Sequence, residues 1–96
     1  MSDRLPITHV AIRFQPPGAE SKQVYSLPAP NRHHDVIRLI AEQTGVSYVN
    51  THGEDQGFLD SSGRYLNRRQ ALLNARLHNQ IKGAIIHNEL YSENLW

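Results

Sequence analysis

The stretch that decides the fold is ITHVAIRF at residues 7–14, in which apolar and polar side chains alternate. A period of two places successive side chains on opposite faces of an extended chain, so this stretch is predicted to be a half-buried β-strand. Pro16-Pro17-Gly18 interrupts the pattern, and Gln23–Leu27 is predicted to return as the second strand of a hairpin. Pro28 then ends the sheet pairing, because proline has no N–H to donate.

Helical spacing of apolar residues follows twice, each time after an asparagine. Asn31 is predicted to cap a first helix over residues 32–44, and Gly45 stands where a helix commonly ends in a left-handed residue. Asn67, with a glutamine three residues later, has the pattern of a capping box and predicts a second helix that ends near residue 78.

The remaining segments complete a prediction of the α+β class. Residues 56–66 are predicted to form a second hairpin around a glycine-containing turn, and residues 83–87 a last strand. A short strand is also predicted within residues 46–50, and residues 89–96 form a polar and aromatic tail. We therefore expect residues 1–96 to form a single ligand-binding domain, with a mostly antiparallel sheet (two hairpins plus a last strand) and two helices on one side.

Composition narrows the functional classes. With 39% hydrophobic and 20% charged residues in 96 positions, the chain has the composition of an ordinary globular domain and has no long apolar segment. It contains no cysteine and no secretory signal pattern, which favours a reducing cytosol. A net charge of +1 argues against a protein that coats nucleic acid.

Cations stand at both predicted helix starts, where the helix dipole disfavours them. The first helix begins with Arg32, His33 and His34, and the second with Arg68 and Arg69. A helix N-terminus with arginines beside it is suited to bind phosphate, so these residues are predicted to contact an anionic ligand. The alternative is a solvated helix start whose arginines pair with nearby carboxylates.

Catalytic and metal-binding patterns are missing from the sequence. The six histidines match no ligand spacing, and no nucleophile elbow, phosphate loop or dinucleotide fingerprint is present. We therefore predict no metal, no cofactor and no catalytic residue. The protein is expected not to be an enzyme.

Several blocks, in order along the chain, resemble one family of small phage proteins. They are the helix start at residues 32–38 with its paired histidines, the Gln-Gly-Phe at residues 56–58, the Gly-Arg-Tyr and Arg-Arg segment at residues 63–71, and Ser-Glu-Asn-Leu-Trp at residues 92–96. In this arrangement the chain resembles the first-described Thoeris anti-defence sponges. Those proteins sequester cyclic ADP-ribose isomers made by bacterial immune enzymes and do not cleave them.

The resemblance implies a partner, and the residues at the helix starts and the nearby aromatic residues are the expected contacts. The partner is a cyclic nucleotide-like signal in the host cytoplasm, either a cyclic ADP-ribose isomer or a cyclic oligonucleotide of the CBASS type. The expected ligand-binding residues, among which Phe58 and Tyr65 stack on the base, are Arg32, His33, His34, Phe58, Arg64, Tyr65, Arg68 and Arg69. Because a chain this small can hardly enclose such a ligand alone, we expect a homo-oligomer with sites at subunit interfaces.

Two other functions remain open from the sequence. The protein is alternatively an inhibitor that binds a host defence enzyme directly, or a small nucleic-acid-binding module. Capture and release of a small molecule on heating distinguishes the sponge from the inhibitor. Steep salt dependence of DNA or RNA affinity would identify the nucleic-acid-binding module.

Overall fold

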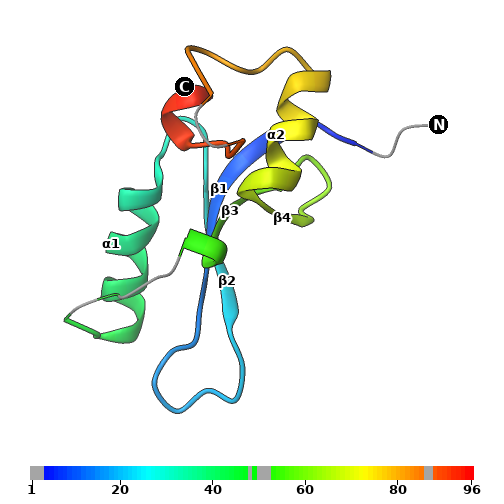
Figure 1. Ribbon diagram of the computed structural model, residues 1–96. Coiled ribbons are helices and arrows are strands. Elements are labelled where there is room, and N and C mark those ends of the chain that lie inside the picture. The colour runs from blue at the N-terminus through cyan, green and yellow to red at the C-terminus, as the bar shows by residue number, and fades with distance from the viewer. Residues whose placement is uncertain (1–3, 48, 50–52, 86–87) are drawn as a thin grey trace.

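The computed structural model describes residues 4–47, 49, 53–85 and 88–96, and it confirms an α+β fold. Four antiparallel strands form one sheet in the order β2-β1-β3-β4, so the first strand of the chain lies between two others. The elements in chain order are β1 (Ile7–Phe14), β2 (Gln23–Pro28), α1 (His33–Thr44), the 3-10 helix η1 (Gly53–Asp55), β3 (Gln56–Asp60), β4 (Tyr65–Asn67), α2 (Arg68–Leu77) and the 3-10 helix η2 (Ser92–Asn94) (Figure 1).

One face of the sheet carries the hydrophobic core. Val10 pairs with Leu27 and with Phe58, and Phe58 pairs with Leu66, so these four side chains share a face. Both helices add buried residues to the same apolar cluster, namely Val36, Ile40, Ala71, Leu72 and Ala75. The predicted placement of two helices on one side of the sheet is confirmed.

On the opposite face, β3 carries a glycine that makes room for an aromatic ring. A side chain at Gly57 would overlap the backbone oxygen of Leu66 and would lie 2.6 Å from the hydroxyl oxygen of Tyr65. The Tyr65 ring therefore lies across β3 at this position. Ala11, the β1 partner of Gly57, is fully buried as well.

The predicted helix-ending residues have the expected geometry. At the start of α2, Asn67 Oδ1 accepts a hydrogen bond from the backbone N–H of Gln70 at 2.8 Å. The side chain of Gln70 accepts one in return from the Asn67 N–H at 3.0 Å, which completes the capping box. Gly45 ends α1 with a φ of 73°, the left-handed conformation that glycine adopts at no steric cost.

The first helix begins one residue later than predicted. Its N-cap is Arg32 instead of Asn31, because the Asp35 carboxylate accepts the backbone N–H of Arg32 at 2.8 Å. Among the described residues, no helix has the length and apolar character needed to cross a membrane.

Two predicted strands are wrong over the residues that the structure describes. Residues 83–85 form no strand, and 86–87 lie outside the described ranges. The amide of Asn94 instead donates to the carbonyls of Lys82 and Ala84, at 3.2 Å each, so a side chain holds this segment in place of a strand partner. Residues 46, 47 and 49 form no strand either, and the prediction for residues 48 and 50 lies outside the described ranges.

Candidate functional site

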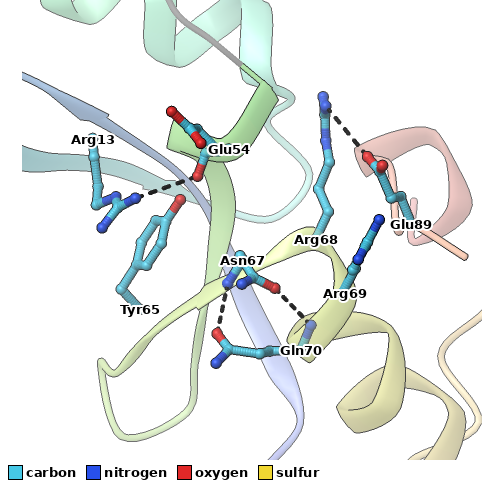
Figure 2. Close-up of a pocket in the computed structure, with 8 residues that line it drawn as sticks. All are labelled: Arg13, Glu54, Tyr65, Asn67, Arg68, Arg69, Gln70 and Glu89. Carbon is cyan, nitrogen blue, oxygen red and sulfur yellow. Dashed lines mark hydrogen bonds and ion pairs between the residues drawn. The ribbon is translucent and has the colours of Figure 1, made fainter.

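The start of α2 and its neighbours line an open hollow of about 720 Å³, here the Arg68 cavity. The capping box fixes the turn from β4 into α2, and this turn presents four consecutive residues to the hollow. Three arginines, two glutamates, two amides and one tyrosine form its lining: Arg13, Glu54, Tyr65, Asn67, Arg68, Arg69, Gln70 and Glu89 (Figure 2).

Arg68 is the most constrained cation of this lining. Its guanidinium donates to Gln56 Oε1 at 2.5 Å and lies 4.0 Å from the Glu89 carboxylate. It also lies over the Tyr91 ring, with 4.5 Å between the guanidinium carbon and the ring centre. Only 15% of the side chain is exposed, so Arg68 is held in position by the surrounding protein. Arg69, by contrast, is exposed at the rim.

The opposite wall is a second stack of arginine on tyrosine. The Arg13 guanidinium lies 5.0 Å from the centre of the Tyr65 ring and donates to the Asp55 carboxylate at 3.4 Å. Asp55 is 3% exposed and also accepts from Lys22 at 2.8 Å. Burial raises the pKa of the Tyr65 hydroxyl, and the neighbouring Arg13 opposes that rise, so this hydroxyl is neutral at physiological pH.

Three polar atoms around this cavity are buried without a hydrogen bond from the part of the chain that the structure describes. They are Nε of Arg13, the hydroxyl oxygen of Tyr65 and Nε of Arg68. An unpaired buried polar group costs about 1–3 kcal/mol, so each such group calls for an explanation. All three belong to residues that line the Arg68 cavity.

A second hollow of about 200 Å³, here the small hollow, adjoins the first. Arg68 lines both hollows. The remaining walls come from the start of α1 and from the C-terminal segment, through Arg32, His33, His34, Tyr91, Ser92 and Glu93.

The C-terminal segment, residues 88–96, joins the two helix starts (Figure 1). The backbone N–H of Leu90 donates to the Arg68 carbonyl at 3.2 Å, beside the start of α2. At the other end, the Trp96 indole donates to the Asn31 carbonyl at 2.6 Å, and the Arg32 guanidinium donates to the backbone oxygen of Trp96. Both cation clusters therefore belong to one continuous region.

His33 has a structural role in addition to its place at the edge of the small hollow. It is 8% exposed, its Nε2–H donates to the Gly57 carbonyl at 2.8 Å, and its ring packs edge-on against Phe58 at 5.1 Å. The pKa of His33 is lowered to about 4, chiefly by burial and to a lesser extent by the positive charge of Arg68, against the raising effect of the hydrogen bond to Gly57. His33 is therefore a neutral donor at physiological pH.

The structure brings together six of the eight predicted ligand-binding residues. Arg32, His33, His34, Tyr65, Arg68 and Arg69 all line one hollow or the other. Phe58 does not, because it is fully buried in the core and its ring is covered. Arg64 does not line either hollow; it is exposed in the β3–β4 turn, where its backbone N–H donates to Asp60.

Sequence reasoning missed several residues of the lining. The period of two in β1 places Arg13 on the face of the sheet opposite the core. It does not predict that Tyr65 of β4 lies against the Arg13 guanidinium. Glu54, Glu89 and Glu93 were missed because each comes from an irregular segment or a short 3-10 helix, whose path has no periodic signal. Within the described ranges, no group of three or more histidines and carboxylates is placed to hold a metal ion.

Comparison with known protein families identifies the family of this chain. The phage T4 y16D protein family matches residues 6–96, nearly the whole chain. No curated protein and no solved structure matches it.

Proposed function

We propose that this chain, which belongs to the phage T4 y16D protein family, is an anti-defence protein that sequesters a nucleotide-type immune signal of the infected host. The signal is a cyclic ADP-ribose isomer or a cyclic oligonucleotide, bound in the Arg68 cavity and held without cleavage in the host cytoplasm. The observation that carries this proposal is the convergence of three arginines and three unpaired buried polar atoms on one cavity.

Each part of such a signal finds a suitable partner in the lining. Phosphate oxygens suit the guanidinium groups of Arg68 and Arg69 together with the first N–H groups of α2. Ribose hydroxyls are donors, and the carboxylates of Glu54 and Glu89 are acceptors within the same lining. The base suits the outer face of the Arg13 guanidinium, whose inner face is stacked on Tyr65.

Retention of the signal without hydrolysis is part of the proposal. Three arginines of the lining are suited to hold phosphoryl groups, and the recovery of the ligand after heating tests whether it stays intact. In this proposal the protein acts by stoichiometric capture.

Self-association is part of this proposal, because the cavity is open to solvent. Leu73 and Leu77 are 46% and 53% exposed, and they follow Arg69 at four-residue intervals along α2. They therefore lie on the same face of the helix as the rim of the cavity. A second copy packed on these leucines would bury apolar area and cover the bound signal.

The direct test is calorimetry with cyclic ADP-ribose isomers and with cyclic di- and trinucleotides, followed by heating of the complex. We expect at least one ligand to bind with submicromolar affinity and to return intact, by chromatography, after the protein is denatured. Recovery of a hydrolysed product would refute capture without cleavage. An absence of binding by every ligand at micromolar protein would refute the proposed function.

A matched pair of variants on α2 locates the site. Arg69→Ala removes an exposed cation at the cavity rim, and Arg76→Ala removes an exposed cation near the other end of the same helix. We expect Arg69→Ala to weaken binding roughly tenfold or more, as for loss of a charged hydrogen bond, without a change in thermal midpoint. Arg76→Ala should bind like the wild type; equal losses in both variants would contradict this site.

A further inference from the structure

The small hollow is distinct from the Arg68 cavity. The two linings share Arg68, and their other residues differ. Arg68 faces the Glu89 carboxylate, which lines the Arg68 cavity, and the Tyr91 ring, which lines the small hollow. Arg68 therefore lies between the two hollows and lines both of them.

The volumes of the two hollows indicate that they hold ligand groups of different size. Sites for small molecules usually measure about 300–1,000 Å³. The Arg68 cavity, at about 720 Å³, lies within this range, whereas the small hollow, at about 200 Å³, lies below it. The small hollow can therefore receive one group of a ligand but not a whole nucleotide.

The charges of the small hollow indicate which group that is. Arg32 and Arg68 contribute two permanent positive charges, and Glu93 contributes one carboxylate. Arg32 uses one edge of its guanidinium to hold the backbone oxygen of Trp96, and a guanidinium has five N–H donors in all. The small hollow thus carries a net positive charge on residues from both helix starts, which suits a phosphoryl group.

We propose that the small hollow is a second anion subsite joined to the Arg68 cavity through Arg68, so that the ligand is a nucleotide with two linked phosphoryl groups that Arg68 contacts where the two hollows meet. The inference rests on the proposed function, in that it places a nucleotide in the Arg68 cavity. It adds a requirement for the second phosphoryl group, and it makes Arg32 and Glu93 the residues that determine this specificity.

The test compares AMP, ADP and cyclic ADP-ribose by calorimetry against the full-length protein. AMP and ADP share one nucleoside and differ by one phosphoryl group. We expect Arg32→Ala to weaken ADP and cyclic ADP-ribose roughly tenfold and to leave AMP within about twofold. Arg38→Ala removes an exposed cation of α1 that lines neither hollow, and it is the matched control.

Glu93→Gln is expected to raise ligand affinity, an effect that a folding defect would not produce. Removal of this carboxylate should strengthen ADP and cyclic ADP-ribose about threefold, the size typical of an exposed charge pair, and should leave AMP unchanged. If either variant changes AMP and ADP affinity equally, the second subsite is refuted although nucleotides still bind. If ADP binds and responds as described but no cyclic signal binds, the subsite stands and the proposed function fails.

Discussion

The buried His33 predicts a specific loss of stability in mild acid. In the unfolded chain this imidazole takes up a proton near its ordinary pKa of 6.5, whereas in the folded protein its pKa is about 4. Between these values the unfolded state binds more protons, so stability is complete above pH 6.5 and falls as the pH decreases toward 4. At about 1.4 kcal/mol for each pH unit, the full loss is about 3 kcal/mol, and about 2 kcal/mol is lost by pH 5.

Urea unfolding at pH 7.5, 6 and 5 measures this loss in the wild type and in His33→Gln. Glutamine has no proton to gain and keeps an N–H that can reach the Gly57 carbonyl. The variant is less stable at pH 7.5 because it loses the ring contact with Phe58, but its further loss down to pH 5 should be about 2 kcal/mol smaller than that of the wild type. His34→Gln removes an imidazole that is 66% exposed and leaves His33 in place, so the His33 contribution must persist in that control. Parallel pH dependence in the wild type and His33→Gln would refute the assignment.

Two further predictions concern the walls of the site and the assembly. Gly57→Ala should destabilise the protein by about 1–3 kcal/mol in urea unfolding and weaken ligand binding, because the new methyl group overlaps the Leu66 backbone and displaces the Tyr65 ring. An unchanged urea midpoint would contradict the position of that ring. Replacement of both Leu73 and Leu77 by glutamate should lower the sedimentation coefficient if α2 is the contact between copies, with little effect on the thermal midpoint, because both side chains are exposed in the single chain. A sedimentation coefficient equal to that of the wild type would exclude α2 as the contact.

The parts of the fold that local rules govern could be predicted from the sequence. The period of two in residues 7–14 and the capping box at Asn67 depend only on residues near in sequence, and both are confirmed. The segment at residues 83–85 is apolar, as a strand would be, but a strand also needs a neighbouring strand to hydrogen-bond with, and residues 83–85 form no strand. The Asn94 amide satisfies its carbonyls instead, and no pattern in the sequence indicates that contact.

The candidate site was predictable where it depends on helix starts and not where it depends on packing. Cations at both helix starts could be singled out from the sequence, because the helix dipole makes their position unusual, and the structure places them along the two hollows. Phe58 could not be separated from an exposed stacking residue, because the alternation in β3 does not say which face the helices cover. Arg13 could not be placed because its contact with Tyr65 depends on β3 lying between their strands.

The C-terminal segment also has a consequence for the order in which the protein matures during synthesis. A ribosome releases the sheet and both helices before it releases residues 88–96, and the N-terminal parts of a chain can begin to fold first. Glu89, Tyr91 and Glu93 arrive only with that last segment, as does the Trp96 contact to the start of α1. A nascent chain is therefore unable to form either complete hollow until these residues have docked between the helix starts.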